Sequence, residues 1–252
     1  KENTIMQIFE PFIWGFDDLE AIFFMTLLLL LYFADIPYLG NEVPFYLCRM
    51  TRKIWLAGQV VYIVCATAIY TVAILLSTIL ICGQRCYVGN IWSETAVKLA
   101  FTSAGKKLSL AASEKTLELT RPYACMTTMF FLLFAYALVM VLLIFWFRIL
   151  WNELAGMIAG VVFNGISFIF SPGILQKLLG ISERKSYLAN VAAGWISPLS
   201  HATYHLHNFG YDRLPSLRDS GIYDMVLVIM LILLNLYSIR TYHFVFDGTG
   251  ER

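Results

Sequence analysis

Five apolar runs dominate the chain, and the first of them reads LEAIFFMTLLLLLYFA over residues 19–34. A helix needs roughly 20 apolar residues to cross the roughly 30 Å of hydrocarbon in a bilayer. A soluble domain has no comparable way to bury so much apolar surface. The pattern therefore predicts an all-α integral membrane protein, with one polytopic helical bundle over residues 1–252 and spans at about 19–36, 54–82, 123–147, 153–170 and 222–240.

Composition agrees with a membrane protein and gives no sign of a nucleic-acid partner. Charged residues make up 14% of the chain and hydrophobic residues 59%, whereas soluble domains carry about 25% charged residues. The net charge is +1, and the chain has no basic block or RNA-binding motif, so we expect no nucleic acid as a partner. The sequence opens at Lys1 without a signal-peptide pattern, and we expect the natural N-terminus to lie further upstream.

Three of the five cysteines lie where predicted helices end or begin, namely Cys82, Cys86 and Cys125. A disulfide among them requires that this end of the helices faces an oxidising compartment. We expect unpaired thiols and keep the disulfide as the alternative. The absence of a CxxC pair argues against a zinc ribbon or a thioredoxin-like site.

The segments between the predicted helices fall into two groups on opposite sides of the membrane. The short segment 37–53 ends in a basic cluster, Arg49, Arg52 and Lys53. Short loops close to helix ends dominate the positive-inside rule, which favours the inner side for this cluster. The long segments 83–122 and 171–221 hold more basic residues in total, so charge alone leaves the orientation open.

Segment 37–53 carries the most specific pattern in the chain. Pro44 suits the first turn of a short helix, where its missing N–H is not needed. Phe45 would then lie on an apolar side, the three basic residues on a polar side, and Trp55 would follow as an interfacial anchor. This pattern is typical of an amphipathic helix at a membrane surface, and an ordinary basic inner loop is the alternative.

The pattern D-x-P…P-F…R-x-x-R-x-x-W-x-x-G-Q, between Asp35 and Gln59, resembles the membrane subunits of ABC-2-type exporters from Gram-positive bacteria. Three stretches are similar to external segments of that family: FEPFI at 9–13, AGWISPLSH at 193–201 and NFGYD at 208–212. Such permeases have six helices with both ends cytoplasmic. The resemblance therefore implies that the first helix is missing from this chain, that 37–53 is cytoplasmic, and that both long segments are external.

The same resemblance implies a place in the bacterial plasma membrane and two kinds of protein partner. In this family the inner loop between the second and third helices carries a coupling helix, which docks on a separate ATP-binding subunit. A second membrane subunit completes the transporter, as a homodimer or a heterodimer. Carried over to this sequence, the coupling residues are Pro44, Phe45, Arg49, Arg52 and Lys53.

The chain has no phosphate-binding loop of its own. The nearest string, SAGKK at 103–107, lacks the leading Gly of GxxxxGK[ST] and the Ser or Thr after Lys, so it cannot cradle phosphates in that manner. We therefore expect ATP and Mg²⁺ in the partner subunit, and no cofactor, metal or catalytic residue in this chain.

Small and polar residues mark two helix faces. Gly156 and Gly160 form a GxxxG step with Asn164 one turn further, a spacing that lets helices approach closely. This face packs either against a partner subunit or within the chain, and Asn164 is expected to hydrogen-bond across helices.

A second face, on the run 54–82, carries Gln59, Tyr62 and Tyr70. These residues line a substrate path or serve as contacts between helices. No ionisable residue is predicted deep inside a run, which argues against a proton relay.

His201 and His205 are four residues apart and would share a helix face, as zinc ligands often do. The pattern lacks the Glu of HExxH, and Asp212 offers the nearest carboxylate. A membrane-embedded metal-dependent hydrolase is thus one alternative function, and a non-transporting immunity or sensor protein is another. The simpler interpretation is polar and aromatic cover on an external hairpin of short helices.

Overall fold

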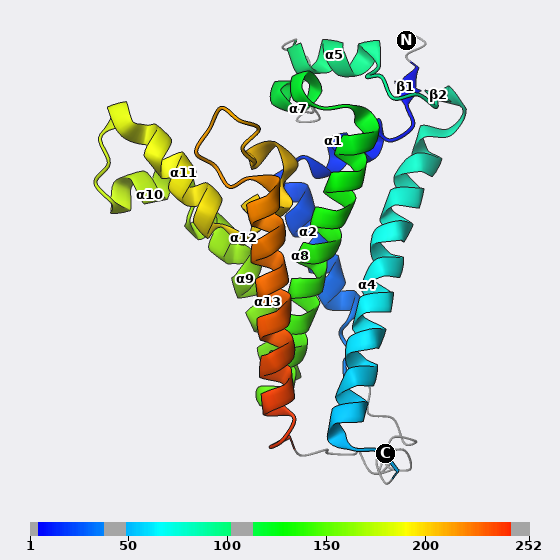
Figure 1. Cartoon of the computed structure of the whole chain (residues 1–252), viewed down its shortest axis with the longest axis vertical. Helices are drawn as coiled ribbons and strands as arrows, with labels where there is room; N and C mark the ends of the chain where they lie inside the picture. Colours follow the sequence, from blue (N-terminus) through cyan, green and yellow to red (C-terminus); the bar gives the residue numbers. More distant parts are fainter. Residues whose placement is uncertain (1–4, 38–48, 102–112, 243–252) are drawn as a thin grey trace.

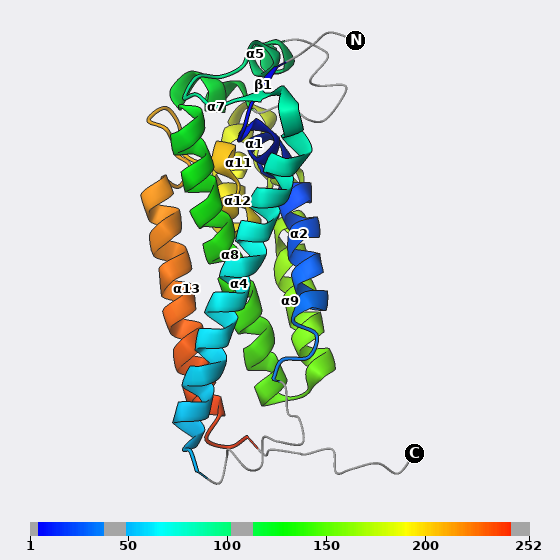
Figure 2. The same ribbon diagram turned by 90° about the vertical axis from the view of Figure 1, so that its right-hand side faces the viewer.

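The computed structural model describes residues 5–37, 49–101 and 113–242. Its main helices run side by side (Figures 1 and 2): α2 (Leu19–Tyr32), α4 (Arg52–Cys82), α8 (Pro122–Leu150), α9 (Glu153–Ile169) and α13 (Leu217–Ser238). Short helices are α1 (Glu10–Phe16), α5 (Glu94–Phe101), α7 (Glu114–Leu119), α10 (Pro172–Leu178), α11 (Ser186–Ile196) and α12 (Pro198–Ala202), with 3-10 turns η1 (Gly83–Arg85), η2 (Glu183–Lys185) and η3 (Tyr204–Leu206). Strands β1 (Met6–Gln7) and β2 (Cys86–Tyr87) form one parallel pair.

Helix α8 forms the centre of the bundle. It contacts α2, α4, α9 and α13, and it runs along the middle of the bundle in Figures 1 and 2. Of its apolar window, 61% is buried, against 22% for the windows of α4 and α13. A helix that is apolar on all sides belongs inside a bundle or a membrane, so the core lies around α8, whereas α4 and α13 keep broad apolar faces exposed.

The predicted all-α class is confirmed, but the predicted five spans are only partly so. Within the described residues, three helices are long and apolar enough to cross a membrane, namely α4, α8 and α13. A fourth span results if α9 and α10 count as one helix bent by 71°. The 14 residues of α2 reach only about 21 Å at 1.5 Å per residue, which is shorter than the hydrocarbon layer. These helices indicate a membrane protein.

Helix α2 ends four residues earlier than its apolar run predicted, because proline disfavours helical backbone at the residue before it. Pro37 follows Ile36, and the chain turns over residues 33–36. Pro172 has a similar effect at the other bent site, where Ser171 is extended and α10 starts in a new direction. The hairpin of α10 and α11, closed by Leu175, Ala189 and Ala193, projects from the side of the bundle in Figure 1.

The connecting segments gather at two opposite ends of the bundle. One, which we call the basic end, holds the start of α4, the turn between α8 and α9, and the end of α13 (Figure 1). The other, which we call the cap end, holds α1, the β1–β2 pair, α5, α7 and α12.

Candidate functional site

The basic end is tied together by Arg52, the first residue of α4. Its Nη1 donates to the carbonyl oxygens of Ile239 at 3.3 Å and Arg240 at 2.5 Å. Carbonyls at the end of a helix have no partner within the helix, and a cation is favourable there. Arg52 therefore fixes the start of α4 against the end of α13.

The remaining predicted coupling residues are only partly described. Pro44 and Phe45 lie outside the described residues, while Arg49 and Lys53 are exposed. Trp55 was expected as an interfacial anchor, but only 6% of it is exposed, because it packs between Phe145 and Tyr242 with ring centroids 6.4 and 6.5 Å away. The exposed residues Arg49 and Lys53 thus come shortly before Trp55 in the sequence, and the Trp55 ring is buried.

Arg148, near the end of α8, binds the backbone just after the C-terminal end of α2. It is 4% exposed, and its Nη1 donates to the carbonyl oxygens of Phe33, at 3.2 Å, and Ile36. Gly156 of α9 packs on the same side chain, and a Cβ at Gly156 would lie 2.7 Å from the carbonyl oxygen of Ile144. The glycine is needed here because no side chain fits between α9 and α8.

The rest of the small-residue face also packs within the chain. A Cβ at Gly160 would lie 2.6 Å from Leu30 Cδ2 of α2. The Asn164 carbonyl oxygen accepts hydrogen bonds from the hydroxyls of Tyr136, at 2.6 Å, and Thr26, at 3.2 Å. The predicted cross-helix hydrogen bond of Asn164 is confirmed, and the face contacts α8 and α2 of the same chain.

In the predicted substrate-path row on α4, the structure shows helix contacts for Tyr70. The Tyr70 hydroxyl donates to the Met25 carbonyl at 2.8 Å, and its ring stacks on Tyr32. Tyr62 is 54% exposed and Gln59 is half-buried. Tyr70 thus acts as a contact between α4 and α2.

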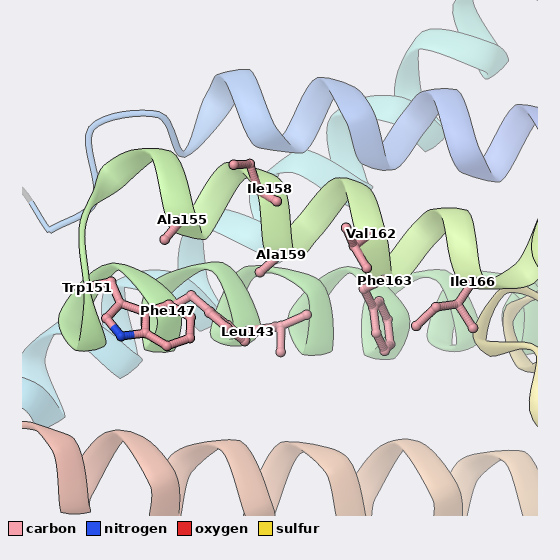
Figure 3. Close-up of a pocket in the computed structure, with 9 residues that line it drawn as sticks. All are labelled: Leu143, Phe147, Trp151, Ala155, Ile158, Ala159, Val162, Phe163 and Ile166. Atoms are coloured by element: carbon pink, nitrogen blue, oxygen red, sulfur yellow. The ribbon is translucent and has the colours of Figure 1, made fainter.

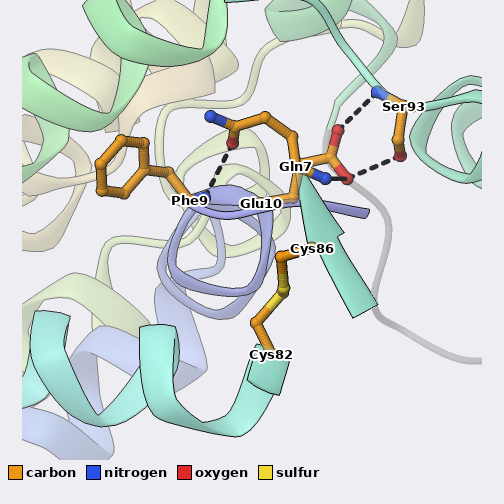
Figure 4. Close-up of a disulfide and its surroundings, with 6 residues drawn as sticks. All are labelled: Gln7, Phe9, Glu10, Cys82, Cys86 and Ser93. Carbon is orange, nitrogen blue, oxygen red and sulfur yellow. Dashed lines mark hydrogen bonds between the residues drawn. A yellow bond between two sulfur atoms is a disulfide. The ribbon is translucent and has the colours of Figure 1, made fainter. Parts of the chain in front are cut away.

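At the cap end, Glu10 connects the first strand to the long segment after α4 (Figure 4). Its carboxylate is fully buried and accepts from the Ser93 backbone N–H at 2.7 Å, the Ser93 hydroxyl at 2.6 Å and the Gln7 N–H at 3.2 Å. Burial raises the pKa of Glu10, and the hydrogen bonds from Ser93 and Gln7 oppose this rise without cancelling it.

A disulfide joins Cys82 and Cys86 beside this network (Figure 4). The expectation of unpaired thiols is therefore wrong for these two residues, whereas Cys125 is a free and buried thiol. Cys86 also pairs with Met6 in the β1–β2 register. The bridge thus fixes the strand that receives the N-terminal segment.

A second polar network joins α1 to the segments that precede α8 and α13. Asp17 is 6% exposed. Its Oδ1 accepts from the backbone N–H of His205 at 3.0 Å and pairs with His205 Nδ1 at 3.1 Å, and its Oδ2 accepts from the Thr116 hydroxyl at 3.2 Å. Lys115 extends the network, because its Nζ lies 2.7 Å from Asp212 Oδ2.

The histidines that suggested a metal do not share a site. His201 contacts Ser220 and the Trp195 carbonyl, whereas His205 pairs with Asp17 and Asp212 pairs with Lys115. Among the described residues, no group of three or more His, Cys, Asp or Glu side chains is placed to hold a metal ion.

An apolar groove of about 490 Å³ follows α8 and α9 (Figure 3). Apart from the indole of Trp151, its lining side chains have no hydrogen-bonding group with which to orient a polar ligand. The lining residues are Leu143, Phe147, Trp151, Ala155, Ile158, Ala159, Val162, Phe163 and Ile166.

Sequence reasoning also missed a buried carboxylate inside an apolar helix. Asp224 is 2% exposed, and its two carboxylate oxygens have no hydrogen-bond partner among the described residues. The predicted helix start at 222 placed it at a helix end, but the capping box between Ser216 and Asp219 starts α13 at Leu217. Asp224 therefore lies about two turns inside α13, while the expectation that no ionisable residue lies deep inside a run stays a prediction.

Comparisons with known proteins found no match: no family model, no curated protein and no solved structure corresponds to this chain.

Replacing Gly156 with Leu should lower the stability of the bundle, because the new side chain would meet the α8 backbone. Overpacking of this kind costs about 1–3 kcal/mol. Gly165→Leu is the matched control, since it lies on the same helix with nothing within 4 Å of its Cβ position. Thermal unfolding in detergent should show a lower midpoint for Gly156→Leu alone. Equal midpoints for the two variants would contradict the close contact of α9 with α8.

The pair of His205 and Asp17 should make the cap end less stable as the pH rises. Burial lowers the pKa of His205, but the hydrogen bonds and charge of Asp17 outweigh burial, and the net pKa is raised. The stabilisation is thus complete below about pH 6.5 and is lost as the pH rises through the raised pKa. We expect His205→Gln to lower the unfolding midpoint more at pH 6 than at pH 9. Asp17→Asn should remove this pH dependence.

Proposed function

We propose that this chain is the membrane subunit of an ATP-driven ABC exporter in a bacterial plasma membrane. In this proposal the subunit forms the substrate path together with a second membrane subunit and couples to separate ATP-binding subunits. The observation that carries the proposal is the ordered pattern from Asp35 to Gln59, which places a basic segment directly before the longest helix. Apolar spans, which a permease requires, are consistent with it.

The chemical difference between the two ends of the bundle supports this assignment. Disulfides persist in oxidising compartments and are rare in the cytosol, so the Cys82–Cys86 bridge favours an external cap end. Exposed Arg49 and Lys53 lie at the opposite end, where the positive-inside rule favours the cytoplasm. Two independent kinds of chemistry thus agree on one orientation.

The basic end also has a mechanical basis for coupling. Helix α4 runs over 31 residues, with Thr51 as its N-cap, and Arg52 fixes its start to the end of α13. A displacement applied at the basic segment would move α4 and α13 together. In the proposed cycle, ATP binding by the partner subunits favours one arrangement of this pair, and ATP supplies the differential binding that a population shift requires.

The topology can be tested with single free cysteines in a background that carries Cys48→Ser, Cys65→Ser and Cys125→Ser and keeps the native disulfide. Arg184→Cys, in the turn between α10 and α11 that the proposal places outside, and Arg240→Cys at the basic end both replace exposed residues. We expect an impermeant thiol reagent to label position 184 in intact cells and position 240 only after permeabilisation. The reverse pattern would exclude the proposed orientation.

Coupling can be tested by co-expression and co-purification with a candidate ATP-binding cassette protein from a neighbouring reading frame. Arg49→Glu should reduce recovery of that subunit at least several-fold, because a charge at a small docking surface can dominate binding. Arg184→Glu makes the same charge change in the turn between α10 and α11, away from the basic end, and should leave recovery unchanged. Equal recovery with both variants would show that the basic segment does not dock the ATPase.

The alternatives lead to different results in the same preparation. A non-transporting immunity or sensor protein would purify without any ATPase. A metal-dependent hydrolase would contain stoichiometric metal, although the separate partners of His201 and His205 do not favour that function.

A further inference from the structure

Ser220, in the first turn of α13, lies between two histidines. Its Oγ is 2.8 Å from His201 Nδ1 and 2.8 Å from His207 Nε2. The serine and His207 are fully buried, and His201 is 1% exposed. Such a serine flanked by histidines could suggest a nucleophile, but its burial leaves a substrate no access, so its chemistry concerns protons.

The remaining partners of the two histidines fix where their hydrogens lie. His201 Nε2 is 3.2 Å from the Trp195 carbonyl oxygen, and His207 Nδ1 is 3.1 Å from the Tyr204 carbonyl oxygen. A carbonyl oxygen only accepts, so both of these nitrogens carry hydrogen. A neutral imidazole has a single N–H, and the nitrogen that faces Ser220 is therefore an acceptor in each ring.

The neutral network is one hydrogen short. Ser220 has one hydroxyl hydrogen to donate, but two acceptor nitrogens face it. One histidine lone pair must then face the oxygen lone pairs of Ser220 without a hydrogen between them. Burial excludes solvent that could supply a donor, and an unsatisfied buried polar group is costly.

We propose that His201, Ser220 and His207 together bind one proton. With that proton in place, one histidine donates to the Ser220 oxygen and the Ser220 hydroxyl donates to the other histidine, so every polar atom of the three side chains has a partner. A second proton would leave the Ser220 hydrogen without an acceptor and would place two cations around one oxygen. The site therefore takes up one proton and not two.

The charges around the site are consistent with a single cation. From α13, Asp219 favours the charged form of His201, whereas Lys115 of α7 donates to the His207 carbonyl oxygen at 2.7 Å and brings a positive charge close to that residue. Tyr223 stacks on the His201 ring at 4.2 Å. His205 opposes a charge on His207. No titratable side chain of α2, α8 or α9 forms a hydrogen bond with the three residues in the described part of the chain.

Proton uptake should occur on the acid side of the usual histidine range. Burial lowers the pKa of His201, and it lowers the pKa of His207 to about 4. The site joins α12 and η3 to the start of α13, so its occupancy decides whether the hydrogen bonds between the cap end and a spanning helix are complete. The inference concerns the cap end alone and does not rest on the proposed export function.

The test is nitrogen NMR of the purified chain in nanodiscs, with ¹⁵N-labelled histidine and the substitutions His205→Gln and His243→Gln to leave the two histidines of interest. We expect one imidazolium per chain to form between pH 6.5 and 4, with the second ring neutral throughout. Ser220→Ala should weaken proton binding at least tenfold, a shift of one pH unit, and Ser220→Thr, which keeps the hydroxyl, should restore it.

Two results would overturn the proposal. One is uptake of two protons, or of none, by the protein with Ser220 in place. The other is an unchanged midpoint in Ser220→Ala. If Ser220→Ala does not fold, the proton count in the parent and in Ser220→Thr still decides the matter.

Discussion

The close approach of α9 to α8 is the contact on which the rest of the bundle depends. Apolar helices gain nothing by leaving lipid for one another, so close packing and polar contacts must hold them together. Gly156 and Gly160 bring the two backbones near, and this proximity places Asn164 against Tyr136 and Thr26. It also encloses Arg148, which holds the end of α2 through the carbonyls of residues 33 and 36. Two glycines therefore set the positions of three helices.

Apolar patterning located the main helices because a span is a local property of the sequence. Its errors lie at helix ends, because specific side chains decide where a helix begins and where it stops. Pro37 stops α2 early although the apolar run continues, and the capping box at Ser216 starts α13 before its run begins. The first error turned a predicted span into a helix of 14 residues. The second concealed Asp224 as an apparent end residue. Both signals were present in the sequence, but hydropathy alone does not weigh them.

The sites were less predictable, because a residue's partner depends on distant parts of the chain. The GxxxG spacing predicted a close contact between helices but did not indicate whether the neighbouring helix belongs to the same chain or to another one. The i, i+4 spacing of His201 and His205 suggested a shared face, but the 3-10 turn after α12 separates them and each finds a different partner. Glu10 and Asp17 gave no local signal, since Ser93 and His205 lie 83 and 188 residues away in sequence. The coupling assignment follows from the resemblance and stays a prediction.

The Cys82–Cys86 bridge closes a loop with a sequence separation of only 4. In the chain-entropy account so small a loop stabilises a fold by only about 2 kcal/mol, and larger loops contribute more. The bridge therefore contributes little to overall stability and mainly sets the local direction of the chain. It fixes the angle at which the backbone leaves α4 and enters β2, where a two-residue ladder and the Glu10 carboxylate hold the N-terminal segment. The far end of the longest helix thus has a rigid joint, and rotation of α4 about its axis would carry the cap with it.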